Sequence, residues 1–422
     1  MDHESSIMSD SIQDLSFGYC TNVHAGVTLR DAQDNLQKIA HCVRNQVVPD
    51  GRLPVGLWLP QPVAQQLNNA TAVAKFRDWL EQWSFKAYTL NGFPQGDFHQ
   101  AVVKHAVYEP TWLADSRRDY TCLLADILVG LLPPGHSGSI STLPLGWPHR
   151  SWQQSDFVGA AVQLTLVADH LDRIAQRTGH EIVLAIEPEP GCLLDTAVDM
   201  IEFLERYVLH KASEHVRRHI TVCHDICHSA VMFESQSDAL NAYAASGIRI
   251  GKVQVSSAVE VPWHAAVGNA ALRTTMAEQL RTFDEPRYLH QTTRRAFSPK
   301  GVEMVEDLPV ALRDWLPTQH GPVAPSQNEP TESWRVHFHL PIYTDHFGAL
   351  AGTRGDIEAA VRCLNSHNQH QVAGRPWFTG HYEVETYAWG VLPPELKVPD
   401  LASGIAQELE YFRSILRVCT FV

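Results

Sequence analysis

Residues 181–191 read EIVLAIEPEPG: a run of five apolar residues leads directly into Glu187, and prolines flank Glu189. A continuous apolar run rich in branched residues is typical of a parallel strand that is buried on both faces. A carboxylate where such a strand ends is costly to bury unless it is paired or bound to a metal. The segment therefore predicts a buried parallel strand with a metal-binding carboxylate at its end; a salt-bridged strand terminus is the alternative.

Apolar runs of the same kind recur along the chain and alternate with helical segments. They cover residues 15–20, 53–59, 85–90, 139–143, 182–186, 219–223, 248–255, 334–340 and 381–387, with a weaker run at 287–291. Between Ser155 and Gly179, apolar residues recur every three or four positions, which predicts a helix with these two residues as its caps. This alternation of strands and helices predicts an α/β fold with a parallel sheet.

Nine strand candidates exceed by one the eight strands of a (β/α)₈ barrel, so part of the chain must form an insertion. We predict a single TIM-barrel domain over residues 1–422, with a flexible N-terminus at 1–13 and an insertion or lid at 257–333 before the last strands. The insertion contains a Pro-rich polar loop at 317–332. A doubly wound open sheet is the alternative fold, but no GxGxxG fingerprint follows the first strand.

The composition excludes several classes of protein. The 422 residues include 33 Lys and Arg against 47 Asp and Glu, a formal charge of −14, which repels phosphate backbones, so we expect no nucleic-acid partner. No run approaches the length of a membrane span. Eight scattered cysteines without a CxxC pair indicate reduced thiols, and the polar N-terminus does not read as a secretory signal. We therefore expect a cytoplasmic protein; its oligomeric state stays open.

Asp225 and His228 form the second candidate site, in the segment TVCHDICHS. In a TIM barrel the active site lies at the C-terminal ends of the strands, and Asp225 follows an apolar run. The Asp-x-x-His spacing lets the carboxylate bind a metal while the imidazole reaches the substrate. The rival interpretation is a structural zinc site of Cys223, His224, Cys227 and His228, which lacks the usual distant second pair of ligands.

Further candidates follow other apolar runs and share the predicted rim. They are Asn22 and His24, Asn91, the group Lys252, Gln254 and Ser256, the pair His337 and His339, and the pair Glu383 and Glu385. Residues two apart on a strand lie on one face. Of the two glutamates we favour Glu385, which is closer to the end of its strand, and Glu383 has a salt-bridge role as its alternative. For Gln254 the alternative is a hydrogen-bonded amide inside the barrel.

With Glu187, Asp225, His228 and Glu385 in these positions, the chain resembles the xylose-isomerase-like TIM-barrel superfamily of sugar phosphate isomerases and epimerases. Five segments are more specifically similar to the metabolite-traffic protein EboE family. They are GYCTNVHAG, TLNGFPQGDFH, YLHQT, WRVHFHLPIY and EVETYAWGVLP, and they extend from about residue 17 to 393. The resemblance therefore covers nearly the whole chain.

The resemblance implies one divalent ion, such as manganese, cobalt, magnesium or zinc, at successive strand ends. The implied ligands are Glu187, Asp225 and Glu385, with Gln254 or His339 as candidates for the third position, and the implied substrate-binding residue is His228. From their positions in the sequence, we also expect His24, Asn91 and Lys252 to bind substrate. Gln254 departs from the family pattern, because relatives have His or Asp on that strand. Either Gln254 binds the ion weakly, or His339 or His290 supplies the imidazole, or the ion is lost.

These observations predict an isomerase or epimerase that acts on a small sugar or polyhydroxy carbonyl compound. The ion would polarise the carbonyl while Glu187 and Glu385, as catalytic residues, remove and return a proton. A non-catalytic barrel that binds a metabolite for processing or traffic is the first alternative, motivated by Gln254. A metal phosphodiesterase of the endonuclease IV kind is the second, motivated by His24 and the pair at 337 and 339.

Overall fold

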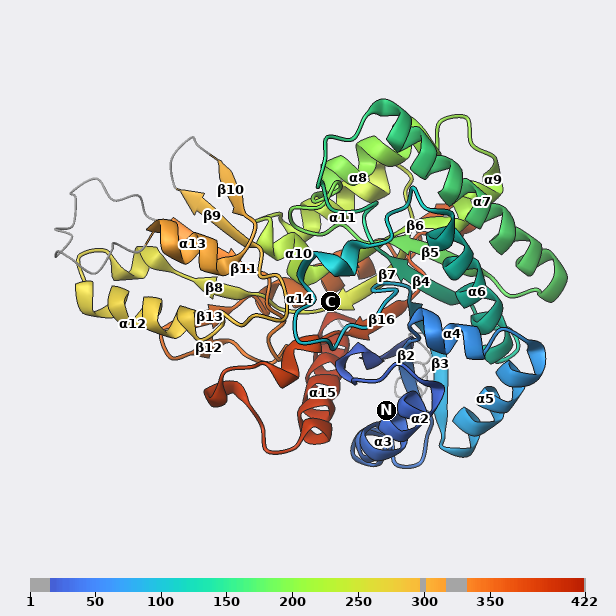
Figure 1. The fold of residues 1–422 in the computed structure, drawn as a ribbon, viewed down its shortest axis with the longest axis horizontal. Helices are drawn as coiled ribbons and strands as arrows, with labels where there is room; N and C mark the ends of the chain where they lie inside the picture. The colour runs from blue at the N-terminus through green and yellow to red at the C-terminus, as the bar shows by residue number, and fades with distance from the viewer. Residues whose placement is uncertain (1–15, 297–300, 316–331, 421–422) are drawn as a thin grey trace, which may run out of the picture.

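The computed structural model describes residues 16–296, 301–315 and 332–420. Eight parallel strands close into a barrel in the order β1-β16-β7-β6-β5-β4-β3-β2 (Figure 1). Their bounds are Ser16–Cys20 (β1), Leu53–Trp58 (β2), Phe85–Asn91 (β3), Gly138–Thr142 (β4), Ile182–Ile186 (β5), Ile220–Asp225 (β6), Ile250–Val255 (β7) and His381–Val384 (β16). The predicted TIM barrel is confirmed. The predicted flexible segment 1–13 lies outside the described residues.

Helices follow the barrel strands and cover the outside of the barrel (Figure 1). After the first four strands come η1 (Thr21–Val23), α2 (Leu29–Asn35), η2 (Leu36–Ala40), α3 (His41–Val47), α4 (Gln61–Gln66), α5 (Ala70–Gln82), η3 (Lys104–Tyr108), α6 (Asp115–Leu131) and α7 (Gln154–Thr178). Later come α8 (Ala197–Phe203), η4 (Leu204–Val208), α9 (Glu214–His219), α10 (Ile226–Val231), α11 (Gln236–Ala245), α14 (Gly355–Ser366), η6 (Tyr387–Gly390), η7 (Pro394–Leu396) and α15 (Leu401–Thr420). A short hairpin, β14 (Gln371–Val372) and β15 (Arg375–Pro376), precedes β16.

Helix α7 is the helix predicted between Ser155 and Gly179. It ends as predicted, with Gly179 in the left-handed conformation at φ 78°. The predicted N-cap is wrong, because the helix begins one residue before Ser155. The Asp156 carboxylate accepts the backbone N–H of Gln153 at 2.8 Å and so fixes this earlier start.

Between β7 and α14 the chain leaves the barrel and forms a second, antiparallel sheet in the order β10-β9-β11-β8-β13-β12. Its elements are β8 (Val259–Val261), η5 (Trp263–Ala266), α12 (Ala270–Arg281), β9 (Thr292–Ala296), β10 (Val302–Val305), α13 (Leu308–Trp315), β11 (Glu332–Val336), β12 (His346–Phe347) and β13 (Leu350–Gly352). They lie to one side of the barrel (Figure 1).

This sheet accounts for the surplus strand candidate. The run at 334–340 contributes β11 to the second sheet, not to the barrel, and the weak run at 287–291 precedes β9 without forming a strand. The sheet continues to Gly352, beyond the range 257–333 expected from the sequence. We refer to residues 257–353 as the insertion. Most of the Pro-rich loop falls among residues 316–331, outside the described part of the chain.

A polar layer inside the barrel lies next to the strand ends that carry the site. Lys252 Nζ lies 2.6 Å from Glu383 Oε2 and donates to Asn91 Oδ1 at 2.8 Å. Gln254 donates its amide N–H to the same Asn91 oxygen at 3.1 Å. Gly56 gives this layer its room, because a Cβ there would lie 1.2 Å from Glu383 Oε1.

Within the described residues, no helix is both long and apolar enough to cross a membrane. The eight cysteines are all free.

Candidate functional site

Three carboxylates meet at the C-terminal ends of β5, β6 and β16. Glu187, Asp225 and Glu385 each place one oxygen within 4.8 Å of the others, and all three side chains are buried. Asp225 Oδ1 accepts the Ser256 hydroxyl at 2.7 Å and the backbone N–H of His228 at 2.9 Å. Its Oδ2 is buried and has no hydrogen-bond partner in the described part of the chain. Such crowding of buried carboxylates is stable only with protons or a cation among them.

The electrostatics of the three carboxylates follow from this crowding. Burial, followed by repulsion from the neighbouring carboxylates, raises the pKa of Glu187 well above its ordinary value and that of Glu385 to about 8. Burial also acts to raise the pKa of Asp225, but the imidazoles of His228 and His339 and its two hydrogen bonds outweigh burial and lower it. A protein without an ion here therefore holds protons on the glutamates, and a divalent cation would replace them.

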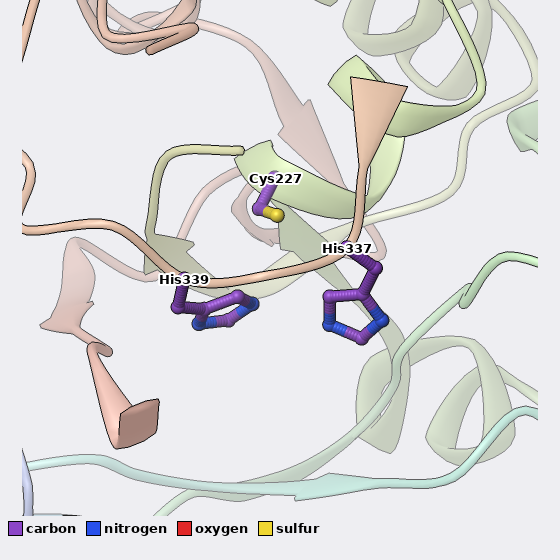
Figure 2. Close-up of side chains that lie close together, drawn as sticks. All are labelled: Cys227, His337 and His339. Carbon is purple, nitrogen blue, oxygen red and sulfur yellow. The ribbon is translucent and has the colours of Figure 1, made fainter. Parts of the chain in front are cut away.

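His339 reaches the carboxylates from the insertion. Figure 2 shows His337 and His339 on the same side of the segment that follows β11, with Cys227 of α10 nearby. His339 Nδ1 lies 2.7 Å from the backbone oxygen of Glu385, and because a carbonyl only accepts, Nδ1 carries the proton. The remaining lone pair on Nε2 is buried without a partner among the described residues and lies 3.9 Å from Asp225 Oδ2. A divalent cation fits this donor set, because it would satisfy both orphaned atoms.

Two further imidazoles and a fourth carboxylate adjoin this group. His228 and His337 approach each other with their Nε2 atoms 3.2 Å apart, and Glu189 offers an oxygen within 4.8 Å of their ligand nitrogens. The other groups near Glu189 are Tyr108, whose hydroxyl donates to Oε1 at 2.7 Å, and Gln291. The sequence pattern did not predict a place at the site for Glu189, although this residue is the second glutamate of the EPEP motif that contains Glu187.

A cavity opens onto this cluster and encloses about 570 Å³, including the part that is open to solvent. Its polar lining consists of Asn22, Asn91, Lys104, Glu187, Glu189, His228, His337, His339 and Glu385, and its apolar and aromatic lining of Phe93, Pro94, Phe98, Val107, Tyr108, Tyr288, Leu289 and Tyr387. Lys104 Nζ lies 2.5 Å from Asp307 Oδ2, which joins the β3–α6 loop to the insertion. This mixture of polar and aromatic lining suits a small polyhydroxy compound.

Three residues expected at the site lie elsewhere. Lys252 is fully buried inside the barrel against Glu383 and does not line the cavity. Gln254 does not line the cavity either; its amide N–H is bound to Asn91, and its Oε1 is buried without a hydrogen-bond partner among the described residues. His24 contacts the Tyr19 hydroxyl at 2.9 Å and lines a separate, smaller pocket. Asn91 does line the cavity, but its side-chain oxygen is already engaged by the polar layer.

The alternative metal donors named from the sequence are not gathered in the structure. His224 Nε2 contacts Gln236 Oε1 at 2.7 Å, away from the proposed tetrahedral set. Cys227 packs with Val231 and Ala258, and burial raises the pKa of its thiol well above the ordinary value. Outside the predicted set, its Sγ lies within 4.8 Å of a ring nitrogen of His337 and of His339. Both ring nitrogens of His290 are engaged, by the backbone oxygen of His337 and by Glu285.

No protein-family model and no curated protein sequence matches the chain. Among solved structures, a xylose isomerase-like TIM barrel protein from Mycobacterium smegmatis in complex with magnesium superposes with a TM-score of 0.50 at 9% identity, covering 96% of this chain and 97% of that chain. An L-ribulose 3-epimerase gives 0.48 at 11% identity, covering 96% and 95%. An AP endonuclease of family 2 from Brucella melitensis gives 0.36 at 12%, covering 57% and 79%. The chain thus has the fold of the xylose isomerase-like TIM barrels.

Proposed function

We propose that this protein is a metal-dependent isomerase or epimerase that moves a proton within a sugar-like polyhydroxy carbonyl compound. The observation that carries the proposal is the meeting of three buried carboxylates with the orphaned atoms Asp225 Oδ2 and His339 Nε2. Glu187, Asp225, Glu385 and His339 would hold the ion. His339 would supply the imidazole, because β7 carries Gln254 at the position where relatives have His or Asp. Carboxylates with one imidazole suit manganese, cobalt, magnesium or zinc.

When bound, the ion would polarise the substrate carbonyl as a Lewis acid. Glu187 and Glu385 line the cavity from β5 and β16, which are not neighbours in the barrel. Once the ion has replaced the protons on these two glutamates, both carboxylates are available as proton acceptors. Glu187 would take the proton next to the carbonyl, and Glu385 would return one. The Asn22 amide, which donates to Glu385 Oε1 at 2.7 Å, orients that carboxyl group.

The test is solvent deuterium incorporation. Wild-type protein loaded with each of the four metals would be incubated in D₂O with a panel of aldoses and ketoses, and the sugar C–H signals followed by NMR. We expect exchange next to the carbonyl of at least one sugar. Glu187→Gln and Glu385→Gln should abolish it, whereas Glu278→Gln, at an exposed position of α12, should not. Absence of exchange with every metal and sugar would contradict the proposal.

A metabolite-binding barrel without catalysis is the second candidate, and Gln254 favours it. This residue stands on β7 where relatives have His or Asp, and an amide oxygen is a weaker metal ligand than either of these side chains. The resemblance of the five sequence segments to the EboE family would imply the same role in metabolite processing or traffic. This candidate predicts that a bound metabolite survives purification and undergoes no proton exchange.

A further inference from the structure

We propose that Glu189, His228 and His337 form a second divalent-cation site beside the first. Their ligand atoms all lie within 4.8 Å of one another, and all three side chains line the cavity. His228 also groups with Asp225 and His339, so the two sites adjoin at His228. The proposal deepens the proposed function, because it rests on the same cluster and adds a second ion to it.

The hydrogen bonds of the two imidazoles carry the argument. His228 Nδ1 lies 2.8 Å from the backbone oxygen of Pro188, so this nitrogen donates. His337 Nδ1 lies 2.8 Å from Gln291 Oε1. That amide is oriented by its own nitrogen, which donates to the backbone oxygen of Pro190 at 3.1 Å, so Nδ1 of His337 donates as well.

Two lone pairs therefore face each other. In the neutral imidazoles both Nε2 atoms lack a proton, yet they lie only 3.2 Å apart in a buried place. Such an approach is unfavourable unless a positive charge lies between or beside the two nitrogens. Metal-binding histidines are typically held in this way, with the distal nitrogen hydrogen-bonded to an acceptor and the other directed at the ion.

The third donor is Glu189. This side chain is 5% exposed, and its Oε2 has no hydrogen-bond partner within the described ranges, while Tyr108 holds its Oε1. Glu189 thus has a free buried oxygen to offer, as Asp225 does at the first site. An ionised carboxylate buried without a partner is costly, and a nearby cation removes that cost.

The charge of the cluster calls for more than one divalent ion. Four buried carboxylates, from Glu187, Glu189, Asp225 and Glu385, surround the same space. Lys252, a buried cation of the barrel interior, is already paired with Glu383. One divalent ion would offset the charge of two of these carboxylates once it has replaced their protons, and a second ion would offset that of the other two.

The donor set indicates which cation the second site takes. Two imidazoles and one carboxylate are typical ligands of catalytic zinc, which keeps its fourth position open to water or substrate. Magnesium prefers oxygen ligands and binds poorly to imidazole. We therefore expect zinc to occupy both sites and magnesium to occupy only the carboxylate-rich first site. In the zinc-loaded protein, His228 would act on the substrate through the ion and not directly.

The experiment is equilibrium dialysis of chelator-treated protein against zinc or magnesium, with bound metal measured by elemental analysis. Wild type should bind about two zinc ions but about one magnesium ion per chain. His337→Gln and Glu189→Gln should each lose about one zinc ion and keep magnesium binding. His346→Gln, at an exposed position of β12, should still bind two zinc ions. Circular dichroism would establish that each variant is folded.

The outcomes separate this inference from the proposed function. One zinc ion in the wild type, lost in Asp225→Asn but kept in both His337→Gln and Glu189→Gln, would overturn the second site and leave the first intact. In that case a proton shared by the two imidazoles accounts for their close approach. No bound metal at all would overturn both proposals.

Discussion

Lys252 Nζ and Glu383 Oε2 lie 2.6 Å apart on neighbouring strands inside the barrel, and both side chains are fully buried. The sequence offered Lys252 as a substrate-binding cation and Glu383 as a possible salt-bridge partner only. The ion pair gives both residues a structural role. Removing one member of such a pair strands a charge in a medium that solvates it poorly.

Lys252→Met should therefore destabilise the protein by about 3–5 kcal/mol, because Glu383 loses its buried cationic partner. Urea unfolding followed by circular dichroism would measure the change. The double variant Lys252→Met/Glu383→Gln should recover part of the loss. Arg362→Met, which breaks the exposed pair with Glu358, serves as the control and should cost no more than about 0.5 kcal/mol. Equal losses of unfolding free energy in Lys252→Met and Arg362→Met would contradict a stabilising buried pair.

Gly56→Ala tests whether the Glu383 carboxylate needs the space that the missing Gly56 side chain leaves. The added methyl group would lie 1.2 Å from Glu383 Oε1, so the carboxylate must move and its contact with Lys252 must change. We expect a loss of about 1–3 kcal/mol or more in unfolding free energy, as for other overpacked interiors. Gly96→Ala is the matched control, since nothing lies within 4 Å of its Cβ position. A thermal melt of Gly56→Ala that matches the control would exclude this crowding.

Glu408 of α15 should make stability depend on pH. Its carboxyl group is buried, accepts hydrogen bonds from the Thr386 hydroxyl, the Trp389 indole N–H and the Ile342 backbone, and burial raises its pKa from 4.5 to about 7. The folded state thus binds this proton more tightly than the unfolded state. Its contribution is complete below about pH 4.5 and is lost as the pH rises to about 7.

The measurement compares unfolding free energies of wild type and Glu408→Gln at pH 5 and pH 8. The difference between the two proteins should shift in favour of the variant at the higher pH, by up to about 3 kcal/mol. Glu395→Gln, an exposed change, should leave the wild-type slope in place. A difference that is the same at both pH values would show that Glu408 does not titrate in this range.

Removing the ion from the first site should lower the melting temperature. A ligand present at about 100 times its Kd stabilises a protein by about 2.7 kcal/mol, so magnesium, which we expect only at the first site, should raise the melting temperature of chelator-treated wild type by several degrees. Asp225→Asn should abolish this increase, because Asp225 is central to the ligand set. Asp284→Asn, at an exposed position, should respond as wild type does. A similar increase in Asp225→Asn would place the ion elsewhere.

The barrel could be predicted because its signal is local. Apolar runs lie in or beside the barrel strands, and the run at Ile182–Ile186 is continuous, which in parallel strands marks burial on both faces. The strand at 334–340 could not be assigned in the same way, because an apolar run does not reveal which sheet it joins. Its place in the insertion depends on pairing with β8 and β9, which are distant in sequence.

The candidate site was only partly predictable for a related reason. Glu187, Asp225 and Glu385 end barrel strands, so the fold itself brings them to one rim. Glu189 lies next to Tyr108 and His337, which belong to other segments of the chain. No spacing in the sequence predicts that these three side chains lie together. Lys252 shares its strand with Gln254, as the sequence indicates, but its side chain pairs with Glu383 inside the barrel and does not reach the cavity.

His339 belongs to the insertion, whereas Asp225 belongs to the barrel. An ion held by both would act as a staple between two parts of the chain that are far apart in sequence, much as a disulfide does. Without it, the insertion would open by partial unfolding at a lower free energy than the barrel, and its amide protons would exchange first. The metal would then govern whether the two sheets unfold as one cooperative unit or in succession.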